Sequence, residues 1–171
     1  PDSLLVLGDT NSGLVSLSAK RKGIRVFHME AGNRCFWERV PEEVNRRVID
    51  HTSTILMPYT QNSKANLLRE GIDIGRIVVT GNPIFEVIEA YRHKIEASRV
   101  HEQFALTPGR YILATMHREE NVDEPGRLAD LLEGLARLHE RYGFPVVCSL
   151  HPRTGKLKEE FKLAGKGSIR F

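Results

Sequence analysis

Apolar and polar positions alternate along the chain in blocks of strand and helix length. The first half has four apolar runs of strand length, at residues 3–7, 24–27, 54–58 and 77–82. Segments of helical composition separate these runs, at residues 14–22, 41–49 and 60–69. Strands that are separated by single helices pair in parallel through right-handed crossovers. The pattern therefore predicts an α/β fold with Rossmann-like parallel sheets.

The pattern restarts in the second half, after a long and increasingly charged helical stretch at residues 83–100. Pro108 and Gly109 mark a boundary. Strands are predicted at residues 111–115 and 145–150. The helix between them has an apolar face made of Leu128, Leu131, Leu132, Leu135 and Leu138. Two half-built α/β units, with an abrupt first strand and an apolar stub at residues 169–171, are typical of the middle of a larger two-domain protein.

Composition narrows the class of protein. Hydrophobic residues make up 40% and charged residues 27% of the 171 residues, as in ordinary globular proteins. No apolar run approaches a membrane span, and no signal peptide opens the chain. The net charge of +3 is spread over both halves, which argues against a nucleic-acid surface but suits an anionic ligand. Cys35 and Cys148 have no metal or disulfide spacing, so we expect a reduced, cytoplasmic setting.

The most polar stretch, residues 28–46, follows the second predicted strand. It holds Glu30, Glu38, Glu42, Glu43, Arg34, Arg39 and Arg46. Pro41 in a first helical turn, followed by two acids, indicates where the next helix begins. Open α/β sheets bind ligands at the carboxyl ends of their strands. No hydrophobic core requires so many charges in one loop, so we expect a site here.

Other polar residues also come directly after predicted strands. They are Asp9, His117 with Arg118, and His151 with Arg153. Carboxylates suit proton transfer at carbon when burial or crowding raises their pKa. Arginine binds a diphosphate through two hydrogen bonds at once. The combination favours an enzyme acting on a nucleotide-activated metabolite.

Structural roles compete with these assignments. Asp9 is also in place to be a helix N-cap, and Glu42 and Glu43 to compensate a helix dipole. His28, at the end of an apolar strand, suits a core histidine. Trp37 suits either loop packing or a stacking surface. The glycines form no dinucleotide or P-loop motif, and no zinc spacing occurs.

Five stretches closely resemble the non-hydrolysing UDP-N-acetylglucosamine 2-epimerases. They are Gly8-Asp9-Thr10-Asn11-Ser12, residues 28–34 (HMEAGNR), residues 41–46 (PEEVNR), Thr80-Gly81-Asn82-Pro83 and residues 117–121 (HREEN). The resemblance extends over essentially the whole chain and about the middle half of that enzyme. It implies a GT-B type fold, two Rossmann-like domains with the UDP-sugar between them. Residues 1–82 would complete the first domain, 83–108 form the linking helix region, and 109–171 begin the second.

The resemblance also implies the reaction. A base removes the proton at C2 while UDP leaves C1; the proton then returns to the opposite face of C2, and UDP adds back. The implied catalytic residues are Asp9, Glu30 and Glu42. The implied substrate-binding residues are His117, Arg118, Arg34, Glu43, Asn45, Arg46 and Asn82. No cofactor or metal is implied, and the full-length protein is expected to be a homodimer.

Departures from the family pattern leave the sugar open. The commoner pattern has leucine at the position of Asn33. The surrounding residues are more similar to a branch acting on UDP-2-acetamido-2,6-dideoxy sugars, although that branch commonly has aspartate at the position of Trp37. A GT-B glycosyltransferase and a nucleotide-sugar-binding module also fit the fold that the resemblance implies. Because the uridine pocket of the family lies beyond Phe171, we expect the 171-residue polypeptide to be inactive alone.

Overall fold

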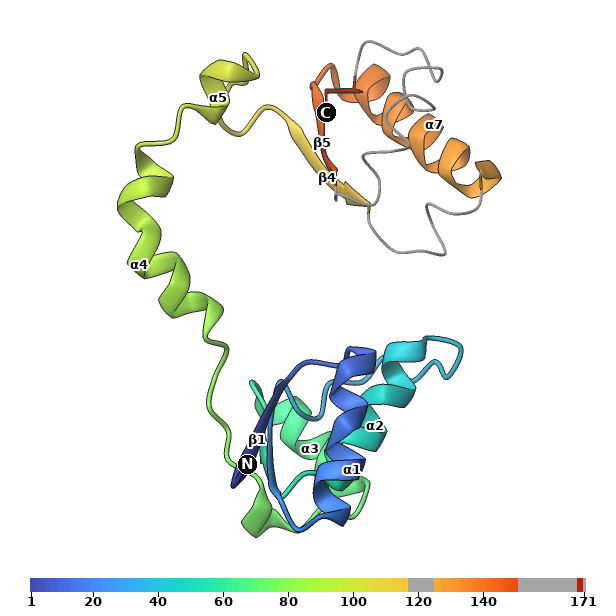
Figure 1. The fold of residues 1–171 in the computed structure, drawn as a ribbon. Helices are drawn as coiled ribbons and strands as arrows, with labels where there is room; N and C mark the ends of the chain where they lie inside the picture. Colours follow the sequence, from blue (N-terminus) through green and yellow to red (C-terminus); the bar gives the residue numbers. More distant parts are fainter. Residues whose placement is uncertain (117–124, 151–168, 171) are drawn as a thin grey trace. The chain divides into compact units, whose positions relative to one another are not determined.

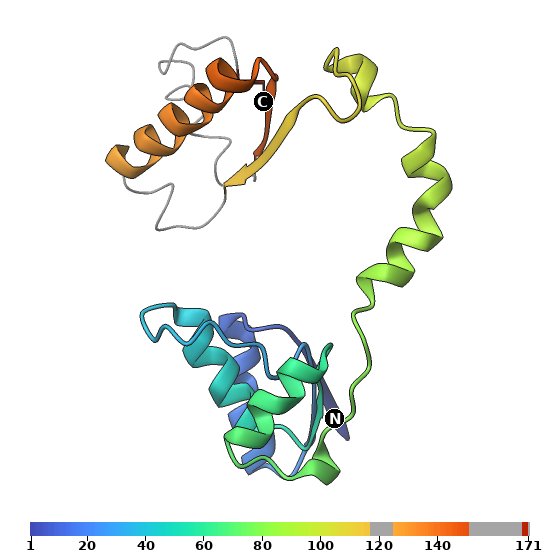
Figure 2. The same ribbon diagram turned by 180° about the vertical axis from the view of Figure 1, so that it is seen from behind.

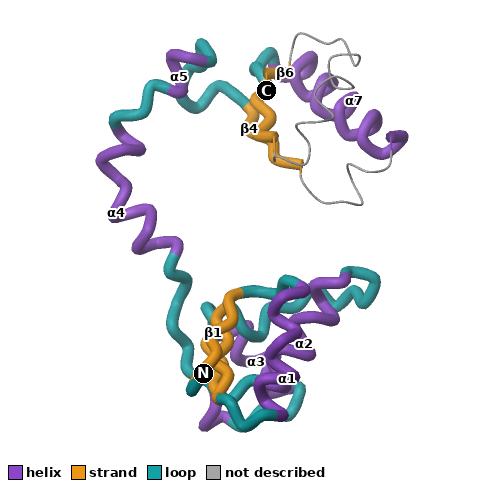
Figure 3. Tube along the Cα trace, viewed as in Figure 1, coloured by secondary structure: helices purple, strands orange, loops and turns teal. Residues whose placement is uncertain are grey.

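The computed structural model describes residues 1–116, 125–150 and 169–170. The chain divides into two compact units, Pro1–Arg92 and His93–Phe171, and each is described by itself. The strands of the two units form two separate sheets (Figure 3). The predicted α/β fold with parallel sheets is confirmed. Among the described residues, no helix has both the length and the apolar character that a membrane crossing requires.

The first unit is built on a three-stranded parallel sheet of order β1-β2-β3. Its strands are β1 Ser3–Leu7, β2 Arg25–Met29 and β3 Ile55–Met57. The connecting helices are η1 Asn11–Leu14, α1 Val15–Arg21, α2 Pro41–Thr52, α3 Gln61–Arg69 and η2 Ile74–Arg76. Helices α1 and α2 pack against each other, and both also contact β2 (Figures 1 and 2).

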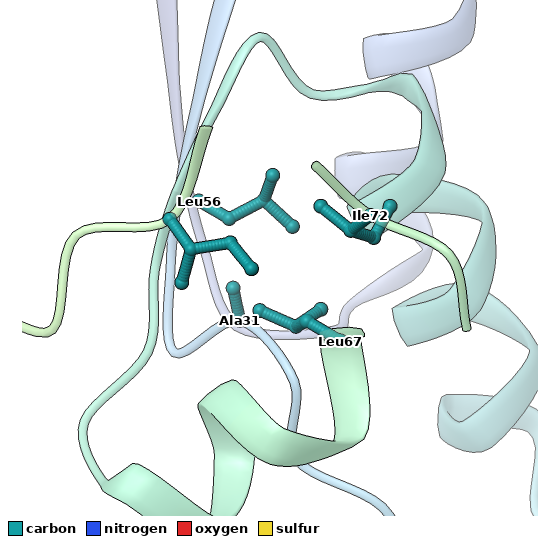
Figure 4. Close-up of a cluster of buried hydrophobic side chains, with 5 residues drawn as sticks. Ala31, Leu56, Leu67 and Ile72 are labelled. Carbon is teal, nitrogen blue, oxygen red and sulfur yellow. The ribbon is translucent and has the colours of Figure 1, made fainter. Parts of the chain in front are cut away.

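Two apolar clusters hold this unit together. The first is formed by Val6, Ala19, Val26 and Ile49, where α1 and α2 meet the sheet. The second is formed by Ala31, Leu56, Leu67, Ile72 and Ile77, and joins β3 to α3 and to the loop after β2 (Figure 4). Because Ala31 belongs to this second cluster, the polar loop that begins at Glu30 is anchored in the core.

The predicted fourth strand at residues 77–82 is wrong in extent. Only Ile77 pairs, through a single bridge to Leu56, although Val78 and Thr80 donate backbone hydrogen bonds to Leu56 and Pro58. Proline has no N–H to donate to a neighbouring strand. The ladder between the two segments therefore stops at Pro58.

The second unit repeats the architecture on a smaller scale. Helix α4 Ile84–Glu96 contains the division between the units and is followed by α5 Val100–Gln103. Strands β4 Ile112–Met116, β5 Val146–Leu150 and β6 Ile169–Arg170 pair in parallel, in that order. Helix α7 Pro125–Tyr142 buries Leu128 and Leu132 of its predicted apolar face. Leu131 and Leu138 of that face are exposed, so the face is only partly covered. The domain boundaries given by residues 83–108 remain a prediction.

Candidate functional site

Three strands of the first unit end side by side at one edge of the sheet. Leu7 pairs with Met29, and Met29 pairs with Met57, so the residues that follow each strand are neighbours. Gly8 N–H donates to the carbonyl of Met29, and Glu30 N–H donates to that of Met57, both at 3.2 Å. Asp9 and Glu30 therefore leave adjacent strands at the edge where parallel sheets bind ligands.

Glu30 has an unusual backbone. Its φ of +69° is uncommon for any residue but glycine, and such conformations persist where the surrounding structure enforces them. The side chain lies over Gly8, because a Cβ built on Gly8 would be 3.4 Å from Glu30 Oε2. Tyr59, just after β3, is close enough to respond to this charge: burial, and then the charge of Glu30, raise the pKa of Tyr59.

Asp9 is held by a cation rather than by a helix end. Arg46 Nε donates to Asp9 Oδ2 at 2.7 Å, and Thr10, not Asp9, occupies the N-cap position of η1. The N-cap role considered for Asp9 is therefore wrong. The same arginine donates to Glu43 Oε2 at 3.1 Å, so one guanidinium joins the end of β1 to the first turn of α2.

Glu42 and Glu43 differ in environment although they are adjacent. Glu42 is exposed, whereas the Glu43 side chain has no exposed surface. Burial would raise the pKa of Glu43, but hydrogen bonds from the Cys35 N–H and thiol, Arg47 and Arg46 lower it to about 2. Glu43 is thus an ionised carboxylate that ties the loop after β2 to α2. The Glu43 side chain is fully buried here, and its contact with a substrate stays a prediction.

Arg34 is also buried. Its guanidinium donates to Glu70 from Nε at 2.7 Å, to Asp50 from Nη2 at 2.8 Å, and to the carbonyl of Asn33. Burial opposes the charge of Arg34, but its bonds to Glu70 and Asp50 raise the pKa above the ordinary value. Because its side chain has no exposure, Arg34 supports the loop in this geometry, and its contact with a ligand stays a prediction.

Asp50 was not singled out in the sequence, yet it connects the loop to two other segments. Its carboxylate accepts from Gly32 N–H at 3.1 Å, from Arg34 and from His28 Nδ1 at 2.7 Å. His28 Nε2 is 3.0 Å from the carbonyl of Gly8, and this histidine is buried, as its assignment to the core predicts. One signal in the sequence could have pointed to Asp50. Its spacing from Glu43 and Arg46 is helical, so the three residues lie on one face of α2.

The remaining predicted site residues fall into two groups. Asn45 Nδ2 donates to the carbonyl of Asp9 at 2.9 Å, and Asn82 Oδ1 accepts from Ile84 N–H at the start of α4. His117, Arg118, His151 and Arg153 lie outside the described residues.

Trp37 is 57% exposed, which is not the burial that loop packing would give. Within the described ranges, no cluster of three or more His, Cys, Asp or Glu residues is arranged to hold a metal ion.

The family is decided by a match along nearly the whole chain. The sequence model of the UDP-N-acetylglucosamine 2-epimerases matches residues 1–166. The chain belongs to this family. A UDP-N-acetylglucosamine 2-epimerase of Methanocaldococcus jannaschii is 41% identical over 170 residues, covering 97% of this chain and 46% of that protein. A UDP-2,3-diacetamido-2,3-dideoxy-D-glucuronate 2-epimerase of Pseudomonas aeruginosa is 37% identical, covering 95% of this chain and 46% of that protein.

The fold of this 2-epimerase family member agrees with that of solved relatives. The crystal structure of the M. jannaschii UDP-GlcNAc 2-epimerase in complex with UDP-GlcNAc and UDP aligns with a TM-score of 0.86 and 39% identity. The alignment covers 99% of this chain and 49% of the other. The chain therefore has part of a GT-B type fold and spans about half the length of the relatives that it matches.

Proposed function

We propose that the protein carrying this chain epimerises a UDP-N-acetylhexosamine at C2, converting UDP-GlcNAc to UDP-ManNAc. The observation that carries the proposal is the arrangement of Asp9 and Glu30 at the ends of adjacent parallel strands, with Arg46 bonded to Asp9. Membership of the 2-epimerase family and the bound UDP-GlcNAc of a relative support it.

The proposed reaction has two halves. A carboxylate takes the proton from C2 while the C1–O bond breaks and its electrons leave with UDP, giving a 2-acetamidoglucal. A carboxyl group then returns a proton to the opposite face of C2 as a UDP oxygen adds to C1. Inverting C2 this way requires proton-transfer groups on both faces of the ring, which is the reason for more than one carboxylate.

We assign proton transfer to Asp9, Glu30 and Glu42, without assigning which of them acts as the general acid and which as the general base. Stabilising the departing diphosphate calls for cationic donors, for which the family motif offers His117 and Arg118. Asn45, Arg46 and Asn82 complete the proposed contacts with the substrate. The burial of Arg34 and Glu43 favours a different contribution from these two residues, that of holding the loop in place.

The identity of the sugar substrate is a more specific proposal than the C2 epimerisation itself. The names of the relatives include a 2,3-diacetamido glucuronate as well as N-acetylglucosamine, so C2 epimerisation occurs in the family on different hexoses. UDP-GlcNAc is our first candidate, and a UDP-2-acetamido-2,6-dideoxy sugar is the second, because Asn33 stands where the commoner pattern has leucine. That the 171 residues alone are inactive, and that the protein is a cytoplasmic homodimer, remain predictions.

Proton NMR of the anomeric region tests the proposal. The native protein that carries this chain is incubated with UDP-GlcNAc and, separately, with the 6-deoxy UDP-sugar. New anomeric signals of the C2 epimer are expected, and the faster substrate identifies the sugar. Transfer of the sugar to an acceptor with loss of UDP would instead support a GT-B glycosyltransferase, and binding without any change of the sugar would support a binding module.

A further inference from the structure

The side-chain amide of Asn33 lies between Glu30 and helix α3. Asn33 Nδ2 donates to Glu30 Oε1 at 3.1 Å, and Ser63 Oγ donates to Asn33 Oδ1 at 2.9 Å. Both ends of the amide are therefore occupied. An ionised carboxylate only accepts hydrogen bonds, so the group that faces Glu30 has to be the NH₂.

The orientation of this amide is fixed from α3. Thr60 caps the helix by accepting from Ser63 N–H at 3.0 Å, and the two hydroxyl oxygens are also 3.0 Å apart. The Ser63 hydroxyl donates its one proton to Asn33, so the Thr60 hydroxyl is the donor to Ser63 Oγ. The hydrogen bonds from Thr60 to Glu30 therefore all run in the same direction. Such a series strengthens each of its bonds and ends on the carboxylate of Glu30.

The backbone of the loop is also clamped against α3. Gly32 has φ of +77°, and a Cβ on it would be 2.3 Å from the carbonyl oxygen of Ser63. Asn66 Nδ2 donates to the carbonyl of Gly32 at 3.0 Å. Asn33 therefore has little freedom to move relative to Ser63, and its amide keeps a fixed position beside Glu30.

We infer that Asn33 is a positioning residue for Glu30: it engages Oε1 and leaves Oε2, which lies over Gly8, as the oxygen that exchanges a proton with the substrate. This inference rests on the proposed function. A proton-transfer group has to be held in a narrow range of positions, and small displacements reduce the rate strongly. Asn33 acts through Glu30 and needs no contact with the sugar.

Two substitutions of Asn33 distinguish the effect of its hydrogen bond to Glu30 from the effect of its side-chain volume. Asn33→Leu keeps a similar volume without a donor. Asn33→Asp keeps the acceptor for Ser63 but places a second carboxylate beside Glu30. Asn62→Leu is the matched control, because Asn62 is an exposed asparagine on the same helix as Ser63.

Steady-state epimerisation by the native protein is measured for each variant. For Asn33→Leu we expect kcat to fall about 10- to 100-fold while KM changes by less than about threefold, with the melting temperature retained. For Asn33→Asp the acidic limb of the kcat profile moves to higher pH, since two adjacent carboxylates take up a shared proton more readily. Asn62→Leu behaves as the unmodified protein.

The inference is overturned if Asn33→Leu keeps its kcat, or if kcat, KM and melting temperature change together as in a folding defect. Failure of the unmodified protein to epimerise any UDP-sugar overturns the proposed function instead. A second readout needs no turnover. The NMR signal of the Asn33 side-chain NH₂ is expected to shift in both Glu30→Gln and Ser63→Ala, and an unchanged signal contradicts the hydrogen-bond series itself.

Discussion

Arg46 Nε lies 2.7 Å from Asp9 Oδ2, and this bond joins a strand end to a helix 37 residues further along the chain. The arginine is in turn fixed by Glu43, which is buried. Burial would lower the pKa of Arg46, but its bonds to Asp9 and Glu43 raise it. The position of a proposed catalytic carboxylate thus depends on the first turns of α2.

Replacing Arg46 by lysine tests this dependence. Lysine keeps the charge but not the fork of donors that reaches both Asp9 and Glu43. We expect kcat/KM for epimerisation to fall about 10- to 100-fold in Arg46→Lys, because Asp9 is no longer held. Arg21→Lys, on the exposed end of α1, is the control. An unchanged kcat/KM in Arg46→Lys would show that Asp9 does not need this arginine.

Acid should weaken the fold through Glu43. Its pKa is about 2 in the folded chain against an ordinary 4.5, so its ionised form stabilises the native state above pH 4.5. That contribution, on the order of 3 kcal/mol, is lost as the pH falls from 4.5 towards 2. Urea unfolding at several pH values should show a shallower decline for Glu43→Gln than for the unmodified chain. Parallel declines would contradict the assignment.

Much of the architecture was predictable because local patterns decide it. The apolar face of residues 128–142 and the cap at Thr60 both specify helices that the structure contains. The extent of the fourth predicted strand, at residues 77–82, was not predictable from the apolar character of this segment. Whether residues 78–82 form a strand depends on Pro58, which directly follows β3 and has no N–H to donate.

Gly32 should tolerate no side chain. Gly32→Ala introduces a Cβ at 2.3 Å from the carbonyl oxygen of Ser63 as well as a left-handed alanine. We expect the free energy of unfolding to fall by more than about 3 kcal/mol. Gly71→Ala is the control, with φ of +82° and nothing within 4 Å of the new Cβ. Its expected cost is only about 1 to 2 kcal/mol. Equal losses for the two variants, measured by urea unfolding, would exclude the close approach to Ser63.

The variant Arg34→Met distinguishes a structural role of this arginine from a role in substrate binding. Removing the guanidinium leaves Asp50, which has no exposed surface, without its cation. We expect a loss of about 3 to 5 kcal/mol in the free energy of unfolding, as for other broken buried ion pairs. A variant of normal stability with a strongly raised KM would instead support the substrate contact that the sequence predicts.

The candidate site was predictable in its positions but not in its internal contacts. That Asp9 and Glu30 end neighbouring strands follows from the α/β pattern, because parallel strands place their carboxyl ends at one edge. That Arg34 turns inward to Asp50 and Glu70 follows only from the fold, since both partners are distant in sequence. A charged loop residue looks the same in the sequence whether it faces a ligand or a buried carboxylate.

Solvent deuterium at C2 is the most direct test of proton transfer by this site. The native protein is incubated with UDP-GlcNAc in D₂O, with Glu30→Gln and Asp9→Asn beside it, and the sugars are analysed by mass and NMR. The account predicts one deuterium at C2 of the epimer, slow appearance of label in recovered substrate, and strong loss of both in the variants. Epimer without deuterium at C2, or labelling that is unchanged in both variants, would contradict it.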